Sequence, residues 1–244
     1  YYQEPFLSRD HTEIMLKTVG VTIKKANNET YLMPPIESLR PLNIEIPGDP
    51  SSAAFFAGAA SILPRSKLVL KKILSNPTRF EFFNIIQLMG TDINLTNEKN
   101  EAGETVNDIT VKYRNLVGIE VEPNKIPSII DEIPMIAIIA TQAIGKTVIR
   151  GAKELRVKES DRINAIVLNL RKMGASVVEY DDGFEITGPT KLKAAKIRTF
   201  NDHRIAMAFS VAGLIATGNT KLDNYDCVDI SFPGFFKLMK KLIK

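Results

Sequence analysis

Two arginines in this 244-residue chain stand at positions where the start of a helix disfavours a cation. Arg162 ends the segment Arg-Val-Lys-Glu-Ser-Asp-Arg (Arg156–Arg162), and Arg204 ends the segment Asn-Asp-His-Arg (Asn201–Arg204). An anionic ligand would remove the conflict, because helix N-terminal amides and a guanidinium group both suit phosphate or carboxylate. The two motifs together predict one anion-binding site to which both arginines contribute.

Both motifs also have a purely structural interpretation. In the first, Ser160 or Asp161 would cap the helix that follows, and the charged side chains would form a solvated face. In the second, Asn201 or Asp202 would be the cap. His203 could shuttle a proton, but a histidine beside an Asp cap more often has a structural role.

Asp131, in Ile-Ile-Asp-Glu-Ile-Pro, has two interpretations. It could cap a helix, since Asp accepts hydrogen bonds from free amides and Pro suits the first turn. Asp49 and Asp202 fit that role equally well. It could instead be a general acid or base. The segment Gly48–Ser52 lacks Walker spacing and a lysine, so it is interpreted as a turn followed by a helix cap.

The composition is that of a globular protein, with 44% apolar and 25% charged residues. The net charge is +4, but Lys and Glu are interleaved, so nucleic acid is not an expected partner. Cys227, the only cysteine, excludes an internal disulfide, indicates a reducing compartment and is expected to be buried. One cysteine and two histidines far apart leave no zinc-like cluster. No apolar run reaches the roughly 18 residues that span a membrane.

Three predicted helices are apolar on nearly every side, and such helices must be buried on all sides. After each one comes a predicted strand, and after each strand an amphipathic helix. The first two of these units are closed by a pair of strands, the second pair joined by an Asp-Asp-Gly turn. The apolar helices are Ala53–Leu63, Ile133–Ile144 and Ile205–Ala216, and the strands that follow are Lys67–Ile73, Thr147–Ala152 and Thr220–Tyr225. The amphipathic helices are Arg79–Met89, Asp161–Met173 and Phe232–Ile243, and the closing pairs are Thr91–Asn97 with Asp108–Tyr113 and Ser176–Tyr180 with Phe184–Thr187.

This βαβαββ unit, repeated about three times, predicts an inside-out α/β barrel with buried helices and sheets outside. A helix at His11–Val19 and a hairpin of Val21–Ala26 with Glu29–Leu32 form the second half of an earlier unit. The last unit lacks its closing hairpin, so we expect the chain to be a fragment. Residues 1–47 would end a first, substrate-binding domain. Residues 48–244 would form a second domain with repeats at about 48–115, 116–189 and 190–244.

The motifs together resemble the 5-enolpyruvylshikimate-3-phosphate synthase family. The resemblance implies that this chain corresponds to the C-terminal half of the family's proteins. It covers nearly the whole chain in order, and the Arg-Val-Lys-Glu-Ser-Asp-Arg segment with the downstream Asn-Asp-His-Arg is its most specific part. The other matching stretches are Ser8–Glu13, Gly48–Ala54, Ile130–Pro134 and Ser231–Phe235.

The resemblance implies a transferase of the shikimate pathway, which leads to chorismate and aromatic amino acids. It would move the carboxyvinyl group of phosphoenolpyruvate to the 5-hydroxyl of shikimate 3-phosphate and release phosphate. The family has two inside-out domains that close on the substrates, and it needs no metal or organic cofactor. A cytoplasmic location and a monomeric complete enzyme are expected, with no nucleic acid and no membrane as partner.

The resemblance also implies roles for single residues. Asp131 matches the proton acceptor for the attacking hydroxyl, and it also contacts shikimate 3-phosphate. Glu159 matches the residue that protonates the phosphoenolpyruvate methylene. Arg162 and Arg204 match phosphoenolpyruvate ligands. Lys158 matches a shikimate 3-phosphate contact, as does Arg9 in one bacterial subgroup.

Two departures from the family pattern stand out. Ile230 occupies the position where many members carry a phosphoenolpyruvate-binding lysine. The substrate contacts from the first half of the family's chain are absent, so the missing half is an expected partner and the fragment alone is expected to be inactive. Two alternatives remain open. One is the sister enzyme that acts on UDP-N-acetylglucosamine, and the other is a non-catalytic repeat module that binds anions.

Overall fold

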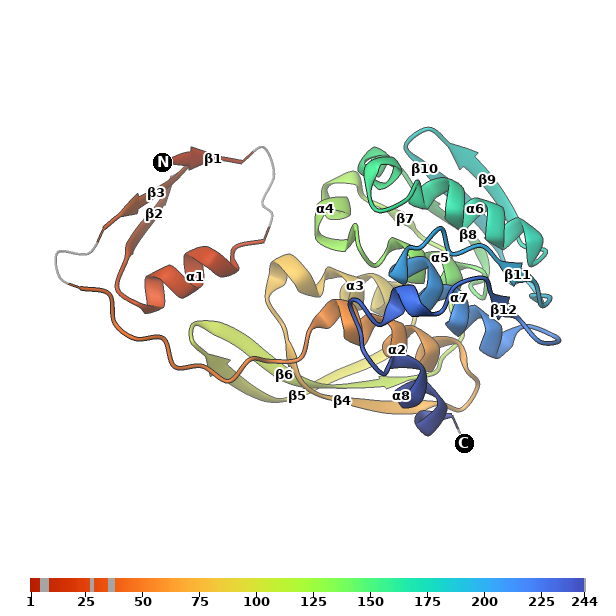
Figure 1. The fold of residues 1–244 in the computed structure, drawn as a ribbon, viewed down its shortest axis with the longest axis horizontal. Coiled ribbons are helices and arrows are strands. Elements are labelled where there is room, and N and C mark those ends of the chain that lie inside the picture. The colour runs from red at the N-terminus through yellow and green to blue at the C-terminus, as the bar shows by residue number, and fades with distance from the viewer. Residues whose placement is uncertain (5–8, 27–28, 35–37, 244) are drawn as a thin grey trace.

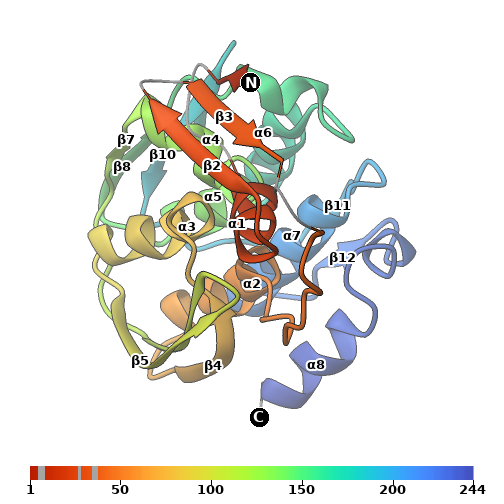
Figure 2. The ribbon, with the colours of Figure 1, turned by 90° about the vertical axis from the view of Figure 1, so that its left-hand side faces the viewer.

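The computed structural model describes residues 1–4, 9–26, 29–34 and 38–243. Ser8, in the first of the matching motifs, and residues 27–28, between the two predicted N-terminal strands, lie outside the described residues. We call residues 1–47 the N-terminal segment and residues 48–243 the body. Figure 1 shows the segment on the left of the body, and Figure 2 views the molecule from the side of that segment.

Three helices form the centre of the body and pack against one another: α2 (Pro50–Ile62), α5 (Ile133–Ala140) and α7 (His203–Ile215) (Figure 1). Nearly all residues of α2 and α5 and about half of those of α7 are buried, as their apolar sequences predict. A Cβ atom on Gly58 of α2 would lie 2.7 Å from Met135 Cε of α5. The glycine therefore leaves room for the Met135 side chain between the two helices.

Three sheets of the body lie outside these helices, so the fold is the inside-out α/β arrangement that the sequence predicts, and a fourth sheet belongs to the N-terminal segment. Among the described residues each sheet is open, and none closes into a barrel. In strand order the sheets are β4 (Lys67–Leu74), β6 (Glu104–Lys112) and β5 (Asp92–Glu101); β7 (Glu120–Val121), β8 (Gly145–Ile149), β10 (Gly183–Gly188) and β9 (Ser176–Tyr180); β11 (Lys196–Ile197) and β12 (Lys221–Leu222); and β1 (Tyr2–Gln3), β3 (Glu29–Met33) and β2 (Thr22–Ala26).

Four of the remaining helices lie close to their predicted positions, whereas the short helix at Ile126–Ile129 and the 3₁₀ helices were not predicted. In the C-terminal helix, Phe235 is buried against Phe55 and Phe56 of α2, and the ring of Phe236 packs edge-on against Tyr225 with centroids 5.3 Å apart. These contacts hold the end of the chain against the central helices. The helices are α1 (His11–Thr18), α3 (Pro77–Leu88), α4 (Ile126–Ile129), α6 (Arg162–Lys172) and α8 (Phe235–Leu242), with short 3₁₀ helices η1 (Pro123–Lys125), η2 (Lys153–Val157) and η3 (Asp226–Val228).

The hairpin of β5 and β6 is longer than the sequence predicts. Its strands meet at a two-residue turn, Ala102-Gly103, where both residues have positive φ, at 50° and 90°. The prediction stopped at Asn97, because the polar run that follows has no apolar alternation. The hairpin tip, which we call the β5–β6 arm, reaches the N-terminal segment, where Thr18 Oγ1 donates to the Ala102 carbonyl at 2.8 Å.

Residues 38–47, the last part of the N-terminal segment, form neither helix nor strand. The predicted domain division after residue 47 therefore falls in an extended linker. That division and the three repeat boundaries stay predictions. Among the described residues, no helix is both long enough and apolar enough to cross a membrane.

Candidate functional site

The candidate site lies at the N-terminal ends of the buried helices. Asp49 caps α2 by accepting hydrogen bonds from the amides of its second and third residues, at 3.2 and 2.9 Å. Asp202 caps α7 in the same way, accepting from the amides of Arg204 at 2.9 Å and Ile205 at 3.4 Å. Both predicted caps are confirmed, and Asp161 is confirmed as the cap of α6. Each of the helices α2, α6 and α7 therefore begins at an Asp cap.

Asp131 is not a helix cap, and the capping interpretation is wrong for this residue. The N-cap position of α5 is Glu132, whose side chain makes no capping hydrogen bond. A short helix, α4, ends just before Asp131, so the chain turns here and its carboxylate points at guanidinium groups. Asp131 Oδ2 accepts from Arg9 Nη2 at 2.6 Å, and Oδ1 accepts from Arg162 Nη1 at 3.2 Å. Arg204 Nη2 lies 3.4 Å from Oδ2.

Arg162 is completely buried and has three carboxylate partners. Its Nε donates to Asp202 Oδ2 at 2.8 Å, and its Nη2 donates to Glu159 Oε2 at 2.5 Å, in addition to the bond with Asp131. The exposed fraction of both Arg162 and Asp202 is 0%. The protein's own carboxylates therefore compensate the charge of Arg162 at this helix start. The sequence alone led us to expect that an anionic ligand would do so.

Arg204 is held more loosely. Its Nη1 donates to the Asp131 carbonyl at 3.3 Å, and its contact with the Asp131 carboxylate is 3.4 Å. Both exceed the 2.7–2.9 Å typical of a strong charge-assisted hydrogen bond. The guanidinium thus keeps N–H donors that a stronger anionic ligand could take. The two arginines converge on one carboxylate, as the helix-start argument requires.

The guanidinium groups determine the charge of Asp131. Burial alone would raise its pKa, but Arg204, Arg9 and Arg162 together lower the pKa to about 2. Asp131 is thus a carboxylate at neutral pH. Burial, followed by the charge of Arg204, lowers the pKa of the half-buried His203, so its imidazole is neutral at pH 7.

The structure places the other predicted site residues differently. Glu159 has a half-exposed side chain, 52% accessible, that faces Arg162. Lys158 Nζ lies 2.5 Å from Glu154 Oε1, and in the described part of the chain no contact joins it to Asp131 or Arg162. Lys158 is therefore near the site in sequence but is paired away from it.

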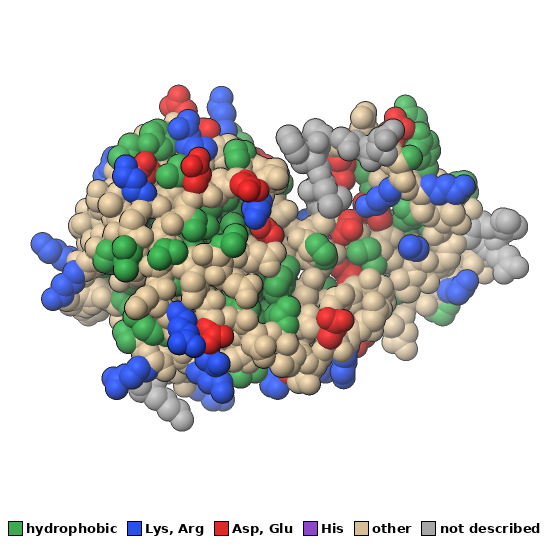
Figure 3. Space-filling model, turned by 180° about the vertical axis from the view of Figure 1, so that it is seen from behind, with side chains coloured by type: hydrophobic (Ala, Val, Ile, Leu, Met, Phe, Trp, Pro, Cys, Tyr) green, Lys and Arg blue, Asp and Glu red, His purple; other side chains and the backbone are tan. Residues whose placement is uncertain are grey.

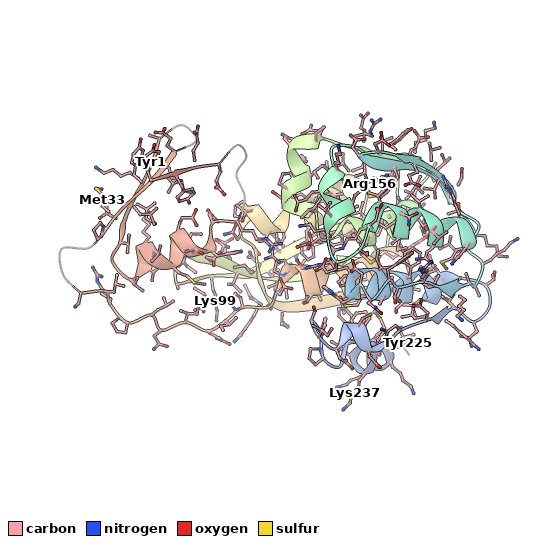
Figure 4. The ribbon with its side chains drawn as sticks, turned by 45° about the horizontal axis from the view of Figure 1, so that its top comes forward. Tyr1, Met33, Lys99, Arg156, Tyr225 and Lys237 are labelled. Atoms are coloured by element: carbon pink, nitrogen blue, oxygen red, sulfur yellow. The ribbon has the colours of Figure 1, made fainter. Side chains whose placement is uncertain are left out.

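Arg156, at the start of the same motif, has a structural role. It donates to Asp161 at 2.9 Å, to Glu179 at 3.1 Å and to the carbonyl of Tyr180 at 2.8 Å (Figure 4). These bonds fasten η2 to strand β9. For this arginine the structural interpretation of the motif applies.

Three polar residues next to the site were not singled out from the sequence. Glu132 is buried and accepts a short hydrogen bond from the Ser51 hydroxyl. Arg79 Nη2 donates to Ser51 Oγ at 2.7 Å and to Asp49 Oδ1 at 2.8 Å. Glu132 could have been noticed as a second carboxylate before a wholly apolar helix. Arg79 gives no such signal, because its partners belong to a different part of the sequence.

Cys227 is buried and free, as expected. Over the described ranges, no three His, Cys, Asp or Glu side chains are grouped so that they could hold a metal ion. The acidic groups of the candidate site face arginines instead. Figure 3 shows acidic side chains gathered where the N-terminal segment meets the body.

Comparison with known proteins gives a consistent set of relatives. The family model described as EPSP synthase (3-phosphoshikimate 1-carboxyvinyltransferase) matches residues 3–239. A 3-phosphoshikimate 1-carboxyvinyltransferase from Sulfurihydrogenibium sp. is 46% identical across 99% of this chain, which covers 57% of that relative. The relative of the same name from Thermodesulfovibrio yellowstonii is 47% identical across 99% of this chain and 56% of its own length.

Solved structures agree. The EPSP synthase from Acinetobacter baumannii superposes with a TM-score of 0.93 at 39% identity, covering 98% of this chain and 56% of that one. The enolpyruvyl transferase NikO from Streptomyces tendae shares the fold, with a TM-score of 0.70 at 20% identity, over 98% of this chain and 54% of that one. This chain therefore spans about half the length of the proteins that it matches.

Proposed function

This chain belongs to the EPSP synthase family, and we propose that it forms part of a 3-phosphoshikimate 1-carboxyvinyltransferase. The reaction would transfer the carboxyvinyl group of phosphoenolpyruvate to the 5-hydroxyl of shikimate 3-phosphate. The hydroxyl oxygen adds to the phosphoenolpyruvate C2 as the methylene carbon takes up a proton. Loss of phosphate and of a proton from the new methyl group then restores the double bond.

The observation that carries this proposal is the convergence of Arg162 and Arg204 on the carboxylate of Asp131. Both substrates are anions, so their encounter needs cations that offset their mutual repulsion. The attacking hydroxyl needs a proton acceptor close to those cations. A carboxylate between two guanidinium groups provides both functions in one place.

Arg9 links substrate binding to the basicity of Asp131 in this proposal. With Arg9 bound at 2.6 Å, the pKa of Asp131 is about 2, which makes the carboxylate a weak base. If Arg9 instead binds a phosphate of shikimate 3-phosphate, Asp131 loses one of its cations. Its pKa then rises towards the usual range of a carboxyl group, so the bound substrate would itself activate the proton acceptor.

The other residues have complementary roles. Arg204, with its loosely held guanidinium, would bind the anionic groups of phosphoenolpyruvate, and Arg162 would contribute one face of the same site. Glu159, half exposed beside Arg162, would protonate the methylene carbon. Lys158 would leave Glu154 to contact shikimate 3-phosphate.

We further propose that turnover needs the remaining half of the enzyme, because the matched relatives are nearly twice as long as this chain. The 244-residue chain alone would bind anions without turning over substrate. The complete enzyme would act as a cytoplasmic monomer in the shikimate pathway towards aromatic amino acids.

The test is phosphate release from phosphoenolpyruvate and shikimate 3-phosphate by the full-length protein, compared with its Asp131→Ala variant. We expect turnover that depends on both substrates and falls at least about a hundredfold in the variant, the range typical of a lost general base. An active Asp131→Ala enzyme would remove Asp131 from this role. Turnover with UDP-N-acetylglucosamine in place of shikimate 3-phosphate would contradict the proposed acceptor.

A further inference from the structure

Glu132 is a buried carboxyl group that the proposed reaction does not use. Only 4% of this residue is exposed, although it directly follows Asp131 and borders the candidate site. A buried carboxyl group costs free energy unless hydrogen bonds or charges compensate it. Burial raises the pKa of Glu132, while the Ser51 hydroxyl and the charge of Arg204 act in the opposite direction.

The partners of Glu132 connect several helix starts. Ser51, in the first turn of α2, donates to Glu132 Oε1 and accepts from Arg79 Nη2 at 2.7 Å. Arg79 comes from the first turn of α3 and also bonds the Asp49 cap at 2.8 Å. A continuous chain of polar contacts therefore runs from the cap of α2 to the start of α5.

On its other side, Glu132 faces the loosely held arginine of the site. Glu132 Oε1 lies 3.9 Å from Arg204 Nη1, the same nitrogen that donates to the Asp131 carbonyl at 3.3 Å. The side chain of Arg204 is largely buried, with 16% exposed. The carboxyl group of Glu132 thus lies behind the guanidinium, and its own position is fixed by Ser51.

We infer that Glu132 is a positioning residue for Arg204. Held by Ser51, which Arg79 bonds in turn, its carboxyl group orients Arg204 through Nη1 and leaves the other N–H donors of the guanidinium for the anionic substrate. Without it, Arg204 would turn further towards the Asp131 carboxylate, and both groups would be less available. This role rests on the proposed function, because it assigns Arg204 to phosphoenolpyruvate.

The kinetic test uses Glu132→Ala and Glu132→Gln in the full-length protein. Glu132→Ala should raise KM for phosphoenolpyruvate by about tenfold, because Arg204 loses the carboxyl group that lies 3.9 Å from its Nη1. KM for shikimate 3-phosphate should change less than about twofold, because Arg204 is assigned to the other substrate. Glu132→Gln should restore most of the loss, since an amide keeps the shape and the bond to Ser51.

Two adjacent serines supply a matched control. Ser51→Ala removes the hydroxyl that holds Glu132 and should raise KM for phosphoenolpyruvate in the same direction as Glu132→Ala. Ser52 lies one residue further along α2, and its hydroxyl bonds only Asp49, at 2.8 Å, among the described residues. Ser52→Ala should leave both KM values unchanged. Equal effects of the two serine variants would contradict the inference.

A second readout does not depend on activity. The Nε–Hε signal of Arg204 in the 244-residue chain can be assigned from its disappearance in Arg204→Lys. The signal should shift or broaden in Glu132→Ala and remain in place in Glu132→Gln and Ser52→Ala. An unchanged signal in Glu132→Ala overturns the inference even if the wild-type protein releases no phosphate. The absence of phosphate release by the wild-type protein would count against the proposed function alone.

Discussion

Arg9 Nη2 and Asp131 Oδ2 lie 2.6 Å apart, although 122 residues separate them in the sequence. This ion pair joins the N-terminal segment to the body at the position where the substrates are proposed to react. The exposed fractions of the two side chains differ, at 50% for Arg9 and 15% for Asp131. The arginine can therefore leave into solvent or to a ligand, while the carboxylate stays in place.

The low pKa of Asp131 predicts how stability depends on pH. A carboxyl group whose pKa falls from 3.8 to about 2 on folding adds stability above pH 3.8 and loses it as the pH falls to about 2. Asp131→Asn lacks this contribution. The difference in free energy of unfolding between wild type and variant should therefore be constant near neutral pH and shrink below pH 3.8. Urea unfolding at a series of pH values measures it, and a difference that stays the same down to low pH would contradict the prediction.

The burial of Arg162 predicts a large loss of stability on its replacement. Arg162→Met leaves Asp202 buried without its guanidinium partner, and breaking a buried ion pair in this way typically costs about 3–5 kcal/mol. Urea denaturation of the 244-residue chain gives this value directly.

Arg171→Met is the matched control for that measurement. Arg171 lies on the same helix, but it is exposed and bonds only the carbonyl of Val177 in the described structure. Its replacement should cost less than about 1 kcal/mol. Similar losses of unfolding free energy in the two variants would show that the ion pairs of Arg162 stabilise the protein no more than the contacts of an arginine at the surface.

A substitution in the β5–β6 arm should weaken the contact between the N-terminal segment and the body. Glu104 Oε1 lies 2.8 Å from His11 Nδ1 and accepts from Asn76 Nδ2 at 2.7 Å. Glu104→Gln replaces the charged acceptor and should speed amide hydrogen exchange in α1, while exchange in β8 and β10 stays the same. The neighbouring Glu101→Gln is the control. Faster exchange throughout the body would instead indicate global destabilisation.

The two proposed subsites should separate kinetically in the full-length protein. Arg204→Lys keeps the charge but loses the planar fork, so KM for phosphoenolpyruvate should rise by about tenfold or more. Lys158→Met should raise KM for shikimate 3-phosphate instead. Initial rates with each substrate varied in turn distinguish the two. If Lys158→Met changes neither KM, Lys158 stays with Glu154 during the reaction.

The fold could be read from the sequence where a pattern has a single physical meaning. Helices that are apolar on every side must be buried, and Asp before such a helix caps it, which held for Asp49 and Asp202. The same cap rule failed for Asp131. The short helix α4 ends at Ile129, and the N-cap position of α5 is taken by the next residue, Glu132. The length of the arm was missed for a similar reason. Its polar strand is stabilised by pairing with β6 and by contact with α1, and neither appears as a local pattern.

The candidate site was predictable in part. Arg162 and Arg204 stood out because their positions conflict with the helix dipole. Helix electrostatics could not show that Asp202 and Glu159 would neutralise Arg162 from within the protein. The contact of Glu132 with Ser51 spans 81 residues, and such distant pairings arise only from the packing of complete units.

The contacts of the N-terminal segment with the β5–β6 arm and with other parts of the body also bear on synthesis of the chain. Residues 9–18 contact side chains and carbonyls of the body that come 66, 84, 93 and 122 residues later in the chain. During synthesis, at about 5–20 residues per second, α1 leaves the ribosome several seconds before the strands that receive it. These contacts of high sequence separation form late. The N-terminal segment is thus made before the residues of the body that it contacts.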